Sequence, residues 1–275
     1  MTIRNLILSM AAVAMLSSAG VAQAGTIDYT GPNTMPGSSM TGWRGSTVWY
    51  AGVSESNDDT ASRFGAPASI TGNAIDFNPT GFFANAPSAG QNSEITDSQL
   101  SFTVVALNGT IIENLSLTES GDTTLTGNPA STLTASSVTT FVFVDITEVD
   151  GVAIEPINVP ATMTFTPSGG TYSLAQDSDG SFPIFSTAWF GEVLIDIDAA
   201  LQQEVADNPG FSFVNGATRL DVTLNNTLTA ISADGESAFI AKKDFDGLTV
   251  TANVPEPASL ALCVLAMLGW AARRR

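Results

Sequence analysis

The residues in this chain that could do chemistry are few, and nearly all of them are carboxylates. The sequence has no histidine, and its single cysteine, Cys263, lies in an apolar stretch near the C-terminus. Ser-His-Asp or Cys-His catalysis and zinc sites built from Cys and His are therefore excluded for the region before that stretch. Carboxylate acid–base chemistry and oxygen-ligated metal ions remain.

Two acidic pairs have a spacing that suits a metal ion. Asp177 and Asp179 precede a glycine and resemble half of a calcium loop, but the third ligand and the later glutamate of an EF-hand are missing. An ordinary acidic turn is the alternative. Asp196 and Asp198 alternate with isoleucines, which predicts two carboxylates on one face of a strand. That face would hold a metal or acid–base pair, or it would simply be solvated.

Aromatic residues offer a second kind of site, a platform on which sugar rings stack. The candidates are Trp43, Trp49 and Tyr50 in one segment and Trp189 with Phe190 in another. Aromatic side chains of β-proteins usually pack in the core or across strands, and that reading is the alternative. No catalytic residue and no cofactor is predicted, and Ca²⁺ is the only metal considered.

The charge is strongly negative and unevenly distributed. Between Gly25 and Val254, five basic residues face 26 acidic ones, a net charge of −21. Such a surface repels nucleic acid and anionic lipid headgroups, so neither is an expected partner of this region. Its only basic pair, Lys242 with Lys243, is expected to protect an edge strand from pairing.

The elements that must position these residues are strands. Roughly twelve short runs rich in Val, Ile, Thr and Phe are separated by turn signals, the pattern of an antiparallel β-sandwich or jelly roll. We predict one such domain over residues 25–254, with two small β domains divided near residue 98 as the alternative. One helix is expected from Asp198 to Ala206, capped by Asp198 and ended by a Pro-Gly pair.

Three turn signals predict β-hairpins. Asn108-Gly109, Asp150-Gly151 and Gly169-Gly170 each stand between two strand-like runs, and such pairs readily adopt the positive φ angles that tight hairpin turns need. Pro156 and Pro160 each remove a backbone donor, so the strand that contains them is predicted at a sheet edge.

The N-terminal residues 1–24 have the three parts of a secretory signal peptide. Arg4 gives the positive start, an apolar run follows, and Ala22 and Ala24 form an A-x-A cleavage site. Gly25 is then the first mature residue, with an uncleaved anchor as the alternative. Signal peptidase and the secretion machinery are expected partners.

The last 21 residues fall into three parts. These are the triad Pro255, Glu256 and Pro257, the apolar run 258–272, and the cluster Arg273, Arg274 and Arg275. As a helix, the apolar run reaches about 22 Å, short of the ~30 Å hydrocarbon core of a bilayer. Terminal arginines stay on the cytoplasmic side. The run is therefore predicted to be a short transmembrane helix with a membrane stop behind it.

This ordered tail resembles the PEP-CTERM sorting signal of exported proteins in Gram-negative bacteria. The resemblance implies transient anchoring in the inner membrane and cleavage near Pro255-Glu256-Pro257 by an exosortase-like enzyme. The body would then reach the cell surface, the outer envelope or the extracellular matrix. Residues 224–250 also resemble a block common in such proteins, to which no activity is attached.

The expected function is therefore that of a structural or interaction protein, not an enzyme. A glycan- or Ca²⁺-binding extracellular module is the alternative, with extracellular polysaccharide as its candidate ligand. A carboxylate-based glycosidase or lyase is a third hypothesis. It needs two acids ~5–9.5 Å apart across a cleft, and the sequence does not single out such a pair.

Overall fold

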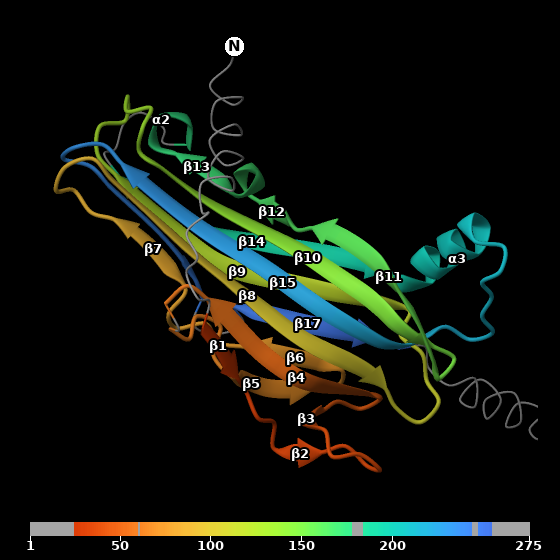
Figure 1. Cartoon of the computed structure of the whole chain (residues 1–275). Helices are drawn as coiled ribbons and strands as arrows, with labels where there is room; N and C mark the ends of the chain where they lie inside the picture. Colours follow the sequence, from red (N-terminus) through yellow and green to blue (C-terminus); the bar gives the residue numbers. More distant parts are fainter. Residues whose placement is uncertain (1–24, 60, 178–183, 244–246, 255–275) are drawn as a thin grey trace, which may run out of the picture.

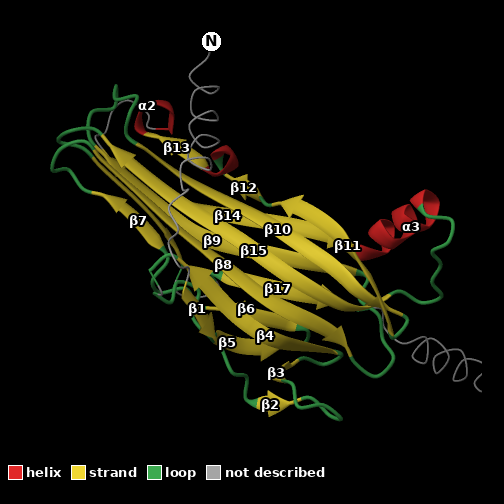
Figure 2. Cartoon of the chain, viewed as in Figure 1, coloured by secondary structure: helices red, strands yellow, loops and turns green. Residues whose placement is uncertain are grey.

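The computed structural model describes residues 25–59, 61–177, 184–243 and 247–254. These residues form two antiparallel sheets that pack face to face, with β10, β15, β8 and β4 in front of β14, β9, β17 and β6 (Figure 1). Helical segments are short and lie toward the ends of the sandwich (Figure 2). The all-β sandwich predicted from the strand pattern is confirmed.

The first sheet contains nine strands. In spatial order they are β11 (Val152–Thr162), β10 (Ala135–Val149), β15 (Ala217–Ser232), β8 (Asn92–Ala106), β4 (Val48–Asn57), β3 (Thr41–Arg44) and β2 (Asn33–Thr34), with β1 (Gly25–Asp28) on β4 and β13 (Thr171–Ser173) on β10. The proline-containing β11 lies at the edge, as predicted. The alternative domain boundary near residue 98 would fall within β8.

The second sheet contains eight strands. They are β12 (Thr164–Thr166), β14 (Ile184–Asp196), β9 (Asn114–Thr126), β17 (Leu248–Asn253), β6 (Ala74–Phe77) and β5 (Pro67–Thr71), with β16 (Ser237–Lys242) beside β9 and β7 (Phe83–Ala86) beside β16. β9 pairs along one half with β17 and along the other with β16. The helical segments are η1 (Ser168–Gly170), α2 (Leu174–Asp177) and α3 (Ile197–Asp207).

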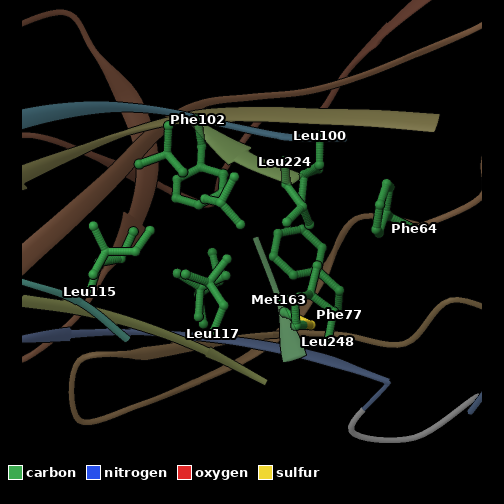
Figure 3. Packing of buried hydrophobic residues seen from close by; sticks show 14 of the residues in the cluster. Phe64, Phe77, Leu100, Phe102, Leu115, Leu117, Met163, Leu224 and Leu248 are labelled. Atoms are coloured by element: carbon green, nitrogen blue, oxygen red, sulfur yellow. The ribbon is translucent and has the colours of Figure 1, made fainter. Parts of the chain in front are cut away.

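The core lies between the two sheets because apolar residues alternate with Thr and Ser along the long strands. Leu115 and Leu117 of β9 face Leu100 and Phe102 of β8 and Leu224 of β15 (Figure 3). All of these side chains are buried. Burying a Leu or Phe side chain contributes about 1.5–3 kcal/mol, so this double layer is the main source of stability.

Of the three predicted hairpins, one is confirmed. Asp150 and Gly151 have φ angles of 52° and 77° and join β10 to β11 with Val149 opposite Val152. Asn108 and Gly109 also adopt positive φ, 58° and 73°, but the strands that they join, β8 and β9, belong to different sheets. That hairpin prediction is wrong. The physical reason is Ile112, which is buried just after the turn, where the chain passes from the first sheet to the second.

The Gly169-Gly170 hairpin is wrong for a similar reason. Its flanking strands, β12 and β13, pair with β14 of the second sheet and β10 of the first. Phe165 and Tyr172, one from each strand, are both buried in the shared core. A turn with positive φ angles therefore connects the two sheets here instead of two neighbouring strands.

The predicted helix is present, but its cap is Asp196 and not Asp198. The Asp196 carboxylate accepts a hydrogen bond from the Ala199 backbone N–H at 2.8 Å, and Asp198 lies in the first turn of α3. The two carboxylates therefore do not share a strand face, and the acid pair proposed for them is wrong. Asp196 is the last residue of β14 and the N-cap of α3. Its side chain accepts from the Ala199 N–H, which has no acceptor within the first turn of the helix.

Candidate functional site

The predicted terminal signals, apart from Gly25, and part of the predicted calcium loop lie outside the residues that the structure describes. Outside the described residues lie Ala22, Ala24, Asp179, Pro255, Glu256, Pro257, Arg273, Arg274, Arg275 and the expected span 258–272. Gly25 begins β1 opposite Asn57, and Asp177 ends α2. Within the described ranges, no helix has the length and apolar character needed to cross a membrane. In the same ranges, no three His, Cys, Asp or Glu residues are grouped as metal ligands.

The strand that leads to the C-terminal tail is an integral part of the second sheet. β17 lies between β9 and β6, with Asn253 opposite Asn114. The backbone N–H of Glu113 donates to the Asn253 carbonyl at 3.0 Å, and Leu248, Val250 and Ala252 are buried. The fold is therefore ordered up to the residue where the tail begins.

The proposed aromatic platforms are not on the surface. The side chains of Trp43, Trp49, Tyr50 and Trp189 are buried, and only Phe190 is exposed, at 43%. The Tyr50 hydroxyl donates to the Asn73 carbonyl at 2.6 Å. Both sugar-stacking predictions are therefore wrong: Trp43, Tyr50 and Trp189 pack in the core between the sheets, and Trp49 is buried on the other face of β4.

A shallow groove of about 540 Å³ is lined mainly by strands of the second sheet. Its lining residues are Ser116, Leu117 and Thr118 of β9, Thr162 and Thr164 at the ends of β11 and β12, and Glu192, Val193 and Leu194 of β14. Leu194 is 66% exposed. Hydroxyl groups, one carboxylate and an apolar side chain suit a neutral polar ligand better than an anion.

The sequence did not reveal this groove because its residues come from separate strands. The available signal was the alternation of β9, which places Ser116 and Thr118 on the face opposite Leu115 and Leu117. Alternation identifies an outward row of hydroxyls, but it does not identify the strands beside it.

A buried ionic cluster links the two sheets near their centre. Lys242 Nζ of β16 lies 2.8 Å from Glu119 Oε2 of β9, and both side chains are fully buried. From the first sheet, Asn226 Nδ2 donates to Glu119 Oε1 and Oε2 at 2.6 and 2.7 Å, and the Thr140 hydroxyl donates to Oε2 at 3.0 Å. We call these four residues the Glu119 cluster.

The edge-strand prediction for Lys242 is wrong, because β16 lies between β9 and β7. Its inward side chain has the rings of Phe64 and Phe82 at 5.5 and 5.2 Å from the ammonium group. Burial lowers the pKa of Lys242, and the neighbouring Glu119 opposes that shift. Lys243, the next residue, is exposed and pairs with Asp122.

Sequence reasoning missed the Glu119 cluster, although strand alternation contains a signal for it. Glu119 shares the inward parity of Leu115 and Leu117, and Lys242 shares that of Ala238 and Ile240. A charge in register with core residues indicates a buried group that needs a partner. The partner itself comes from the opposite sheet and has no local sequence signal.

A second buried carboxylate, Glu55 of β4, organises the chain that follows this strand. Its oxygens accept hydrogen bonds from the backbone N–H groups of Arg63 and Phe64 at 2.7 and 3.2 Å. The hydroxyls of Tyr29 and Ser98 donate to it, each at 2.8 Å. Glu55 therefore joins β1, β4, β8 and the connection to β5.

The tail is the part of the chain that resembles a known family. Residues 253–275 match the PEP-CTERM protein-sorting motif. No curated protein matches the chain. Among solved structures it is similar to TmCBM61 in complex with beta-1,4-galactotriose, at 9% identity and a TM-score of 0.20, over 84% of this chain and 90% of that one.

A family 29 carbohydrate-binding module is similar at 14% identity and a TM-score of 0.19, over 82% of this chain and 88% of that one. Similarity at these TM-scores supports no conclusion about topology or ligand. The motif match, in contrast, confirms the resemblance drawn from Pro255-Glu256-Pro257. The chain carries a PEP-CTERM sorting motif, which marks an exported protein that an exosortase sorts to the cell surface.

Proposed function

We propose that this protein is an acidic, non-enzymatic β-sandwich of structural or interaction type. Its tail would hold it in the inner membrane until an exosortase-like enzyme cuts near Pro255-Glu256-Pro257. The body would then be delivered to the envelope surface or the extracellular matrix. One observation carries this proposal: Asn253 is both the last residue of β17 and the first residue of the matched motif.

That continuity makes cleavage compatible with an intact fold. β17 is an interior strand, so a cut inside it would remove a row of hydrogen bonds from both β9 and β6. A cut at or beyond Pro255 leaves every strand of the described residues intact. The absence of a long linker would also keep the folded body next to the membrane until it is released.

Replacing Pro255, Glu256 and Pro257 by alanine tests the proposal. The full-length form is expected to accumulate in the inner membrane, and the wild-type protein is expected to appear at the surface or in the medium without its tail. The matched control replaces Glu155 and Pro156, the same dipeptide on the exposed edge strand β11, and should be processed normally. Normal processing of the tail variant, measured by fractionation and intact mass, would refute the proposal.

The groove on the second sheet favours a second candidate, the binding of a neutral glycan. Ser116, Thr118, Thr164 and Glu192 present hydroxyl and carboxylate groups beside the exposed Leu194. Glu192→Gln with Thr118→Val should weaken retention of the protein in affinity gels that contain soluble neutral polysaccharide. Glu155→Gln, at an exposed position away from the groove, is the control. Equal retention of all proteins would argue against this candidate.

Calcium binding by Asp177 and Asp179 stays a prediction. A native-state ligand raises the midpoint of thermal unfolding, so melts with and without millimolar Ca²⁺ test it directly. The expected rise should disappear in Asp177→Asn. An unchanged midpoint in the wild-type protein would rule out a calcium site of useful affinity.

A further inference from the structure

The Glu119 cluster holds an amine and a carboxamide on one carboxylate. Lys242 Nζ and Asn226 Nδ2 lie 2.8 and 2.7 Å from the same oxygen, Oε2 of Glu119. Lys242 belongs to the second sheet and Asn226 to the first, so the two groups approach each other across the core. Glu119 therefore gathers the amine and the carboxamide at one site, and holding two reactants together lowers the entropic cost of their reaction.

The surroundings favour the neutral form of the amine and leave the oxygen of the carboxamide able to accept a hydrogen bond. All three side chains are fully buried, and the rings of Phe64 and Phe82 cover the amine. Burial lowers the pKa of Lys242, which increases the population of its neutral, nucleophilic amine. Asn226 Oδ1 is buried and has no hydrogen-bond partner among the described residues, so its carboxamide is incompletely satisfied.

We propose that Lys242 and Asn226 form an intramolecular amide bond, with Glu119 as the proton carrier. Lys242 gives a proton to Glu119, and its neutral Nζ attacks Cγ of Asn226. The new Nζ–Cγ bond replaces the Cγ–Nδ2 bond, and Nδ2 leaves as ammonia after taking up one proton. No oxidant or reductant is needed.

The proton balance gives a physical reason for the reaction. The starting ammonium, carboxylate and carboxamide become a secondary amide, a protonated Glu119 and one ammonia molecule. Two desolvated charges are thereby replaced by neutral groups, which removes the electrostatic cost of a buried ion pair. Release of ammonia to the solvent makes the reverse reaction unfavourable.

The bond would supply a cross-link that the chain otherwise lacks. No cysteine lies between Gly25 and Val254, so a disulfide is impossible there. An amide between β15 and β16 would tie the two sheets together at the centre of the sandwich. Unlike a disulfide, it would not depend on the redox state of the environment.

Mass spectrometry of the wild-type protein tests the proposal without any variant. The intact mass should be lower than the sequence mass by that of one ammonia molecule. Digestion of the denatured protein with trypsin and a Glu-specific protease cuts after Arg219, before Asn226, and after Glu236, between Asn226 and Lys242. The two peptides should remain joined, which also distinguishes the cross-link from succinimide formation at an asparagine. An intact mass equal to the sequence mass, together with two separate peptides, would show that Lys242 and Glu119 form only a buried ion pair and would overturn the proposal.

Matched variants assign the roles. Asn226→Ala and Lys242→Met should restore the full mass, and their neighbours Asn225→Ala and Lys243→Met should keep the deficit. Glu119→Gln keeps the size of the side chain but removes the proton acceptor, so it should leave the peptides separate. Complete cross-linking in Glu119→Gln would overturn the role given to Glu119. If a variant does not fold, the intact mass of the wild-type protein still decides whether the cross-link forms.

Discussion

Replacing Glu55 by glutamine removes one negative charge and one acceptor oxygen from a fully buried position. Each carboxylate oxygen accepts from one backbone amide and one hydroxyl, and Oε1 also accepts from Asn57 Nδ2 at 3.3 Å. Oε1 accepts from Arg63 N and the Ser98 hydroxyl, and Oε2 accepts from Phe64 N and the Tyr29 hydroxyl. Burial raises the pKa of Tyr29 to about 12, so its hydroxyl remains protonated and able to donate.

The size of the effect follows from this geometry. Whichever carboxylate oxygen is replaced by the NH₂ group of glutamine, the backbone N–H that donated to it loses its acceptor. The hydroxyl that donated to the same oxygen can rotate and accept a hydrogen bond from the new NH₂ group. An orphaned buried donor costs about 1–3 kcal/mol. The remaining bonds lose their charge assistance, which roughly halves their strength. We therefore expect Glu55→Gln to lower the free energy of unfolding by about 2–4 kcal/mol.

Urea denaturation at neutral pH, followed by tryptophan fluorescence, measures this change. The midpoint should fall with the m-value unchanged, because the exposed surface of unfolding is the same. Glu155→Gln on the exposed edge strand β11 removes the same charge and should change stability by less than about 0.5 kcal/mol. If the two variants were equally stable, the Glu55 network would not hold the chain as we argue.

Three further perturbations test other parts of the fold. Asp150→Asn should destabilise the protein at neutral pH, because the N–H of Val214 and those of the next two residues hold the pKa of Asp150 below its ordinary value. That stabilisation is present above about pH 4 and is lost as the pH falls through the lower folded-state pKa, so thermal melts of the variant and wild type should converge in acid. In Gly121→Ala the new Cβ would lie 2.0 Å from the Trp189 ring, and a loss of about 1–3 kcal/mol is expected in urea titrations. Tyr50→Phe removes the donor to the partly buried Asn73 carbonyl and should cost about 1 kcal/mol in the same assay.

Local sequence patterns predicted the strands, the sandwich and the edge position of β11, because these depend on alternation and backbone chemistry. The turn at Asp150-Gly151 was predicted for the same reason. The turn at Asn108-Gly109 has the predicted backbone conformation but not the predicted partners. Ile112, three residues later, is buried and forms a bridge with Ala217. Turn chemistry determines how the chain reverses, whereas burial of the following residues determines which sheet it joins.

The candidate sites were less predictable, because their residues meet only through the fold. Asp196 is an example: its carboxylate accepts a hydrogen bond from the Ala199 backbone N–H and caps a helix, so it does not form the predicted acid pair. Lys242 and Lys243 have the same side chain, yet strand parity buries one and exposes the other. The sorting motif, in contrast, was predicted because its chemistry is contiguous in sequence.

The position of the Glu119 cluster connects the core to the tail. β17, which leads into the sorting motif, pairs with β9 from Asn114 to Glu119, and β16 continues along the same strand from Gly121 to Thr126. A force applied at the C-terminus enters β9 at Asn114, opposite Asn253, and reaches Glu119, opposite Leu248, at the far end of β17. Because Asn226 and Thr140 bind Glu119 from the opposite sheet, the cluster passes that force to both layers. A covalent bond between Lys242 and Asn226 would hold the two sheets together just beyond the segment of β9 that β17 loads.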